Sequence, residues 1–400
     1  MPPGSTLALV LDLTRIAEPD DPHAFRFEPQ GYTLRGPTGG LERFDIPWSA
    51  ELLADLEALR RPGRDPAVVQ RVGEVMQRAL RPIGWAGLGE QIRAASEAGR
   101  PVVVTLRSNA AELYALPWEL LTVGASGQHL GELAGVLLRH EWPATATSPE
   151  APAPRPEGGR VLLAWSAAGG AVPAAEHQRA LASAWSEGHV DFDPAADVLA
   201  HASPARLADA LAAAEAAGKP FTVLHLLAHG AVAGTTFGLA LDGEDSPTSI
   251  VDAGRLRQLL APHAATLRLV VLAACDGGNT GALGNHLGSV AQALHRAGIQ
   301  SVVASRYPLS VAGSVVLAEA LYHALLVDLH PLERAFTLTR ARLARRAEQL
   351  DWASLQLYAR AADGDDTRPV VFCPYRGLLA FEARHRRFFF GRDAERRETL

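Results

Sequence analysis

Two apolar runs in the second half of the chain each end in a chemically reactive side chain followed by glycine or by Asp-Gly-Gly. The first run, at 223–230, reads Val-Leu-His-Leu-Leu-Ala-His-Gly and ends in His229 and a glycine. The second, at 269–278, reads Leu-Val-Val-Leu-Ala-Ala-Cys-Asp-Gly-Gly and contains Cys275. Apolar runs of this length are typical of strands buried on both faces of a parallel sheet. Open α/β sheets carry their chemistry at the carboxyl ends of such strands, so we expect both side chains at one edge.

The rest of residues 160–362 alternates strand-like and helix-like segments. We expect strands at 160–165, 221–227, 267–273 and 300–305, a short hairpin at 234–242, and helices at about 174–187, 202–217, 251–260, 284–297, 311–327 and 331–349. This alternation predicts an α/β fold with a mostly parallel sheet flanked by helices.

Residues 1–148 form a smaller predicted α/β block. Its expected strands are at 6–13, 23–34, 101–106 and 134–140, and its expected helices are at 49–60, 66–80, 86–98 and 115–121. The stretch 147–159 has four prolines and two glycines, a composition typical of an exposed linker. The predicted organisation is an N-terminal α/β subdomain at 1–148, a linker at 149–159, a catalytic domain at 160–362 and a further segment at 363–400.

Composition excludes several classes of function. The formal net charge of -6 leaves no basic footprint for nucleic acid. Lys219 is the single lysine, so the chain has no G-x-x-x-x-G-K-[ST] phosphate loop. No apolar stretch reaches the roughly 18–20 residues of a membrane-spanning helix. We therefore expect neither a nucleic-acid nor a membrane partner.

The two cysteines, Cys275 and Cys373, cannot build a disulfide framework and suit a reducing compartment. The first residues lack the basic region of a secretory signal, so we expect a cytoplasmic protein. His225 and His229 do not form a zinc helix, because the run is strand-like and has no Glu after the first histidine. We expect no metal and no cofactor.

Cys275 and His229 together form a candidate thiolate–imidazole pair. Free cysteine is only a few per cent thiolate at neutral pH, and a positioned imidazole raises that fraction. The N–H groups of Gly230 and Cys275 could stabilise the oxyanion of a tetrahedral intermediate. The alternative is structural, since a lone cysteine in an apolar strand is usually a buried small hydrophobe.

Three further sets of residues have weaker assignments. His225 lies inside the first apolar run and is expected in the core. Asp276 either lines the pocket for the residue before the scissile bond, favouring Arg or Lys there, or caps the following turn. His263, His286 and His295 are expected on solvated surfaces.

Several motifs resemble those of CHAT domains, the caspase-like cysteine peptidases related to caspases and separase. They are Ala-Leu-Pro-Trp-Glu-Leu-Leu at 115–121, Arg-Val-Leu-Leu-Ala at 160–164, Val-Pro-Ala-Ala-Glu-His at 172–177, the His-Leu-Leu-Ala-His-Gly and Leu-Ala-Ala-Cys boxes, and Ala-Gly-Ile-Gln-Ser-Val-Val-Ala-Ser-Arg-Tyr-Pro-Leu-Ser at 297–310. His229 and Cys275 fall on the dyad positions of that family, 46 residues apart, close to the roughly 50 of caspase-type enzymes. Family members often have Ser-Ala-Cys followed by Glu and Ser-Gly, so the departure at 273–278 leaves the substrate preference open. The resemblance implies a caspase-like fold and a cysteine endopeptidase.

The segment at 374–395 resembles the entry into STAND-type signalling NTPases. The resemblance implies a regulated peptidase effector joined to an NTPase sensor module beyond Leu400, with bacterial antiphage immunity as its setting and a protein, such as a gasdermin-like one, as substrate. The aromatic residues of 366–400 are expected to pack on the peptidase block or on that module. The alternative function is a non-catalytic caspase-like scaffold.

Overall fold

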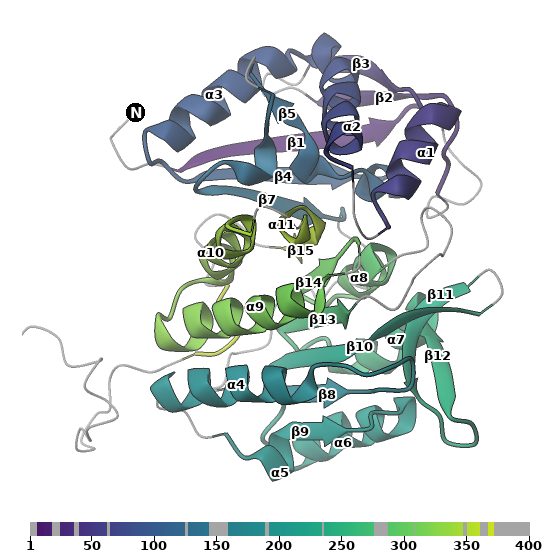
Figure 1. The fold of residues 1–400 in the computed structure, drawn as a ribbon, viewed down its shortest axis with the longest axis vertical. Coiled ribbons are helices and arrows are strands. Elements are labelled where there is room, and N and C mark those ends of the chain that lie inside the picture. The colour runs from purple at the N-terminus through teal and green to yellow at the C-terminus, as the bar shows by residue number, and fades with distance from the viewer. Residues whose placement is uncertain are drawn as a thin grey trace, which may run out of the picture.

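The computed structural model describes residues 6–17, 25–35, 40–61, 65–124, 127–143, 159–188, 192–233, 236–275, 287–307, 309–346, 350–360 and 367–371. Within these ranges most strands form one 13-stranded sheet, in the order β12-β11-β10-β13-β14-β15-β7-β4-β1-β2-β3, with β8 beside β10 and β9 beside β8. Helices flank this sheet (Figure 1). The predicted α/β class with a mostly parallel sheet is confirmed.

The first block contributes the strands β1 (Leu7–Arg15), β2 (Gln30–Arg35), β3 (Leu41–Ile46), β4 (Val102–Ser108) and β7 (Val136–Glu141), and a separate pair β5 (Thr122–Val123) and β6 (Gln128–His129). Its helices are α1 (Ala50–Ala58), α2 (Pro66–Ala79) and α3 (Trp85–Glu97), with 3-10 turns η1 (Arg81–Ile83), η2 (Ala111–Ala115), η3 (Trp118–Leu120) and η4 (Leu130–Glu132). α2 begins where expected because Pro66 fits the first turn and the Asp65 side chain accepts from the Ala67 amide. The edge strand β3 was not predicted.

The second block contains the strands β8 (Val161–Trp165), β9 (Val198–Ala200), β10 (Val223–Ala233), β11 (Thr236–Asp242), β12 (Thr248–Asp252), β13 (Leu269–Cys275), β14 (Ser301–Ser305) and β15 (Leu355–Ala359). Its helices are α4 (Ala174–Gly188), α5 (Pro194–Asp197), α6 (Pro204–Ala216), α7 (Ala253–Leu260), α8 (Leu287–Arg296), α9 (Val311–Tyr322), α10 (Leu332–Ala344) and α11 (Asp351–Ser354), with a 3-10 turn η5 (Ala261–His263) and a π-helical turn η6 (His323–Val327). β10 is longer than predicted because its last residues pair antiparallel with β11.

β15, a strand that the sequence did not predict, joins the two blocks. It pairs antiparallel with β14 on one side and parallel with β7 on the other. β1, β4 and β7 therefore run opposite to β8, β10, β13 and β14, and the two parallel groups have their carboxyl ends at opposite edges. The expected division at 149–159 stays a prediction about chain organisation, while strands from both sides of it share one sheet.

The packing behind this sheet is also continuous. One cluster of buried apolar side chains includes Leu13 and Trp118 of the first block and Leu224 and Phe336 of the second. α4, α9 and α10 lie side by side in front of the strands (Figure 1), and α9 contacts both neighbours. A fully buried ion pair also crosses between the blocks, with 2.7 Å between Arg306 Nη1 and Glu119 Oε2.

Two histidines expected at the surface are buried. His295 lies on the side of α8 that faces the sheet, and its ring contacts Tyr358 of β15. His263 is buried at the end of η5, with 2.9 Å between its Nδ1 and a carboxylate oxygen of Glu215. The prediction was wrong because a histidine can face the core when a ring or a carboxylate lies beside it. His286 lies outside the described residues.

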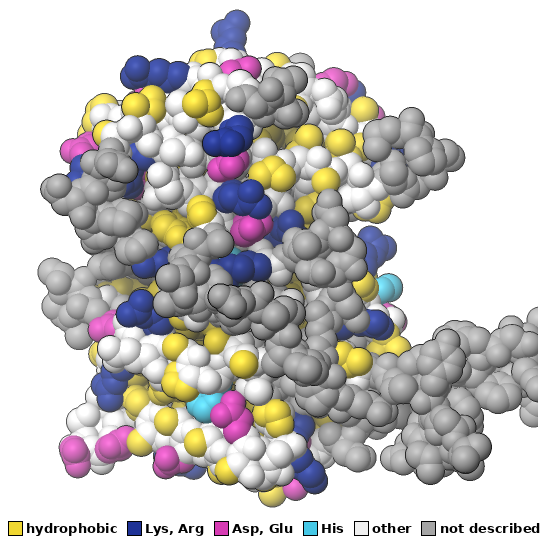
Figure 2. Space-filling model, turned by 180° about the vertical axis from the view of Figure 1, so that it is seen from behind, with side chains coloured by type: hydrophobic (Ala, Val, Ile, Leu, Met, Phe, Trp, Pro, Cys, Tyr) yellow, Lys and Arg dark blue, Asp and Glu magenta, His cyan; other side chains and the backbone are white. Residues whose placement is uncertain are grey.

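No helix in the described part of the chain is both long and apolar enough to cross a bilayer. On the face shown in Figure 2, basic and acidic side chains are interspersed with apolar ones, and no large field of one charge covers the described surface.

Candidate active site

β10 and β13 are adjacent parallel strands, and their register brings the two candidate catalytic residues together. The pairing starts with Val223 beside Leu269 and ends with His229 beside Cys275. Neighbouring strands lie about 4.8 Å apart, and paired positions fall on the same face of the sheet. The backbone therefore places Cys275 and His229 side by side at the carboxyl edge of the second parallel group.

The His229 ring is held at one of its two nitrogens. The side chain is only 6% exposed, and its Nε2 lies 3.0 Å from the carbonyl oxygen of Ala171. A carbonyl oxygen only accepts, so Nε2 carries the hydrogen. Nδ1 is buried and has no hydrogen-bond partner among the residues whose side chains the structure describes. This tautomer leaves the Nδ1 lone pair available to take a proton.

Gly169 and Gly170 allow the backbone of the loop before Ala171 to lie against the His229 ring. A Cβ on Gly169 would lie 2.8 Å from the His229 Cβ, and one on Gly170 would lie 3.2 Å from Nε2. Gly170 also has a φ of +134°, which L residues rarely adopt. This loop was not predicted from the sequence, although the Gly-Gly pair just after the expected strand at 160–165 was an available signal.

Gly230 does not follow the end of a strand as expected. It lies within β10, paired with Leu239 of β11. A Cβ at this position would lie 2.8 Å from the Phe237 ring, so packing against β11 also calls for glycine here. Within the described residues, the last pair of β10 with β13 is His229 with Cys275, one residue before Gly230. The oxyanion role of the Gly230 amide stays a prediction.

His225 lies in the core, as predicted, and is fully buried on β10. Its Nε2 is 2.9 Å from Nδ1 of His177, and its Nδ1 is 2.9 Å from the hydroxyl of Tyr322. Burial lowers the pKa of His177 to about 4 and holds the pKa of His225 well below its ordinary value. Both rings are therefore neutral at physiological pH.

Asp276 lies outside the described residues, as do 276–286 and 372–400. Its predicted pocket or capping role stays a prediction, and so does the packing of the aromatic segment. Among the residues that the structure describes, no three His, Cys, Asp or Glu side chains are grouped to hold a metal ion.

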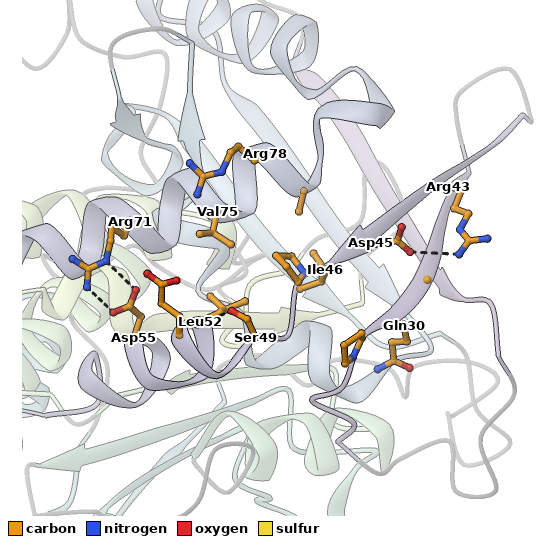
Figure 3. A pocket seen from close by; sticks show the side chains of 15 residues that line it. Gln30, Arg43, Asp45, Ile46, Ser49, Leu52, Asp55, Arg71, Val75 and Arg78 are labelled. Atoms are coloured by element: carbon orange, nitrogen blue, oxygen red, sulfur yellow. Dashed lines mark hydrogen bonds and ion pairs between the residues drawn. The ribbon is translucent and has the colours of Figure 1, made fainter.

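A groove of about 620 Å³ opens elsewhere, between β2 and β3 on one side and α1 and α2 on the other (Figure 3). Arg71 of α2 pairs with Asp55 of α1 at 2.6 Å across it. At its other end Arg43 lies 3.7 Å from Asp45. None of its lining residues comes from β10 or β13, so the groove is separate from the Cys275–His229 pair.

Comparison with known proteins agrees with the motifs. The family model described as "CHAT domain" matches residues 75–360, which is more than half of the chain. The search of curated proteins found no match.

Solved structures give weaker similarities. The complex of RgpB pro- and mature domains from Porphyromonas gingivalis has 12% sequence identity and a TM-score of 0.43, over 80% of this chain and 77% of that chain. Two structures of the Saccharomyces cerevisiae separase–securin complex have 8% identity and TM-scores of 0.44 and 0.45, over 88% of this chain. This chain spans only 30% of the length of that second protein.

Proposed function

This chain belongs to the CHAT domain family, and we propose that it is a cysteine endopeptidase whose dyad is His229 and Cys275. The observation that carries the proposal is the pairing of these two residues in adjacent strands, with Nε2 of the His229 ring held by the Ala171 carbonyl. A thiol is mostly protonated at neutral pH, so a cysteine nucleophile needs a base within hydrogen-bond reach.

In the proposed mechanism, Nδ1 of His229 takes the proton of the Cys275 thiol as the sulfur attacks the scissile carbonyl carbon. The Ala171 carbonyl accepts from Nε2–H and stabilises the imidazolium that forms. The imidazolium then gives its proton to the leaving amine, and a thioester forms at Cys275. Water hydrolyses this thioester with His229 again acting as the base, which regenerates the thiol.

The amide N–H groups of Gly230 and Cys275 are the proposed donors to the oxyanion. Their support is positional, because His229 and Cys275 form the last described pair of the β10–β13 ladder, at the carboxyl edge of the second parallel group. We assign Asp276 to the pocket that receives the residue before the scissile bond, where its carboxylate would favour Arg or Lys.

The biological setting is a further proposal that rests on sequence resemblance. The likeness of residues 374–395 to the entry of STAND-type NTPases supports a cytoplasmic effector controlled by an NTPase sensor in bacterial antiphage immunity. A gasdermin-like protein is one substrate class that fits such an effector.

The test uses a peptidyl acyloxymethyl ketone, which labels activated thiols, together with a fluorogenic peptide library. We expect the chain to be labelled at Cys275 and to cleave a subset of the library. Cys275→Ala and His229→Ala should each lower kcat/KM by about three orders of magnitude or more. Cys373→Ser is the matched control and should keep both label and activity.

Two outcomes contradict the proposal. Turnover by purified Cys275→Ala would show that another group is the nucleophile. A folded chain that is never labelled at Cys275 would favour the non-catalytic scaffold. The library also tests Asp276, since an unchanged preference in Asp276→Asn would exclude the pocket role.

A further inference from the structure

Two histidines that the proposed chemistry does not use face each other between α4 and β10. His177 lies in the first turns of α4 and His225 in the middle of β10, and both side chains are fully buried. Their nitrogens are 2.9 Å apart, and their rings meet edge to face with centroids 5.0 Å apart. Buried polar groups are costly unless they are paired, so this contact calls for an explanation.

The hydrogen bonds around the two rings form a chain with one consistent direction. Ser314 of α9 donates its hydroxyl hydrogen to the Val311 carbonyl, so its oxygen accepts from Nε2–H of His177 at 3.3 Å. Nδ1 of His177 then accepts from Nε2–H of His225, and Nδ1 of His225 accepts from the Tyr322 hydroxyl. With this direction of donation, Nδ1 of each ring accepts a hydrogen bond, which requires both rings to be neutral with their hydrogen on Nε2. The lowered pKa of each histidine agrees with that requirement.

This chain and the candidate dyad share the strand β10. His225 and His229 are four residues apart, so they lie on the same face of the sheet. His177 contacts the first of them and Ala171 contacts the second. The segment from Ala171 into α4 thus contacts β10 at two points, at His225 and at His229.

The connection between these two points is short and stiff. Pro173 has a fixed φ, its carbonyl accepts from the His177 amide at 3.1 Å, and the Ala174 amide donates to Val172 at 2.8 Å. Val172 and Ala174 also pack on buried Leu227 and Ala273, which belong to the two strands of the dyad. A displacement of the first turn of α4 would therefore move the Ala171 carbonyl.

The other side of the loop has its own anchor. The Thr248 hydroxyl of β12 donates to the Ala168 carbonyl at 3.1 Å. Between this anchor and α4 the loop contains Gly169 and Gly170, which add no side-chain contacts that could hold Ala171 in place. The Gly170 amide donates to the Ala167 carbonyl at 3.0 Å, so backbone contacts hold Ala171 on the loop side, and the α4 side supplies its side-chain anchors.

We infer that His177 and His225 are positioning residues that fix the start of α4 and thereby hold the Ala171 carbonyl on Nε2 of His229. The inference rests on the proposed function, because it assigns the support of the proposed base. Without that carbonyl the imidazolium loses its hydrogen-bond acceptor, and thiolate formation at Cys275 becomes less favourable near neutral pH.

The test measures the rate at which iodoacetamide alkylates Cys275 against pH, in a Cys373→Ser background, so it requires no peptide substrate. We expect His177→Phe, which keeps an aromatic ring but removes both hydrogen bonds, to lower the rate about tenfold at about pH 6.5 and hardly at all at about pH 9.5. His177→Asn, which retains an acceptor near the Nδ1 position, should lose less than about threefold. The matched control is His140→Phe, since His140 is equally buried on β7 and contacts neither α4 nor β10.

An unchanged pH profile in His177→Phe, or an equal change in His140→Phe, would overturn the inference while leaving the dyad intact. If His177→Phe does not fold, Ser314→Ala removes the acceptor of His177 Nε2–H and should shift the profile in the same direction by about threefold. An unshifted Ser314→Ala would then overturn the inference. A Cys275 that reacts in the parent chain like an ordinary thiol at all pH values would instead refute the proposed function, and the inference with it.

Discussion

The buried pair of His177 and His225 should make the folded state sensitive to mild acid. Burial lowers the pKa of His177 from its ordinary 6.5 to about 4, with a small opposing effect of Glu176. In the window between these values the unfolded chain binds a proton that the folded chain does not. The free energy of unfolding must therefore fall as the pH is lowered through this window. Above about pH 6.5 the titration of His177 no longer changes it.

The size of the effect follows from the same two values. Going from about pH 7.5 to about pH 5, His177 alone should remove about 2 kcal/mol from the free energy of unfolding. His225 acts in the same direction, because its pKa is also lowered, by burial and by the neighbouring His177. A loss of this size is a substantial part of the stability of an ordinary domain.

Urea unfolding followed by circular dichroism, at a series of pH values, measures this effect. Carboxylates also titrate over part of the range, so the comparison is between the parent chain and His177→Asn, which lacks the titrating ring. The parent should be the more stable at about pH 7.5, and the difference should shrink by about 2 kcal/mol at about pH 5. Two parallel stability curves would refute the reasoning.

Two further changes test the packing around the site. Glu119→Gln should lower the free energy of unfolding by about 3–5 kcal/mol, because it leaves the Arg306 guanidinium buried without its carboxylate. The control is Glu42→Gln on the exposed edge strand β3, which should have little effect in the same urea titration. Gly170→Ala should slow alkylation of Cys275 at neutral pH about tenfold or more, because its methyl group would press on His229 in a backbone conformation that L residues rarely adopt. Gly99→Ala has a positive φ but open space around it, so it should reduce stability without changing that rate, and equal rates for both variants would contradict the role given to the loop.

Much of the fold followed from local patterns. The patterns of apolar residues located α2, α4 and α7 to within a few residues, because this signal acts between near neighbours in the chain. Apolar runs likewise identified β8, β10, β13 and β14. The strands predicted at 221–227 and 267–273 stopped before the observed ends of β10 and β13, since the partners that extend a strand lie elsewhere in the sequence.

For the candidate site too, the sequence determined some features and the tertiary structure determined others. The sequence by itself determined which residue types end two apolar runs, and so which histidine and which cysteine to consider. The structure then decided that these strands are neighbours in a register that pairs His229 with Cys275. It also brought the Ala171 carbonyl onto the ring, a backbone contact that depends on no side chain of its own residue.

Tertiary structure alone decided the relation between the two blocks and the contacts of the buried histidines. β15 has an unremarkable sequence, yet it joins both parallel groups into one sheet, because a strand is defined by its hydrogen-bonded neighbours. His177, His225 and Tyr322 come from three separate elements, and nothing in their spacing reports that they touch. Local sequence encodes backbone preference and burial, whereas contacts between distant segments exist only once the whole core has packed.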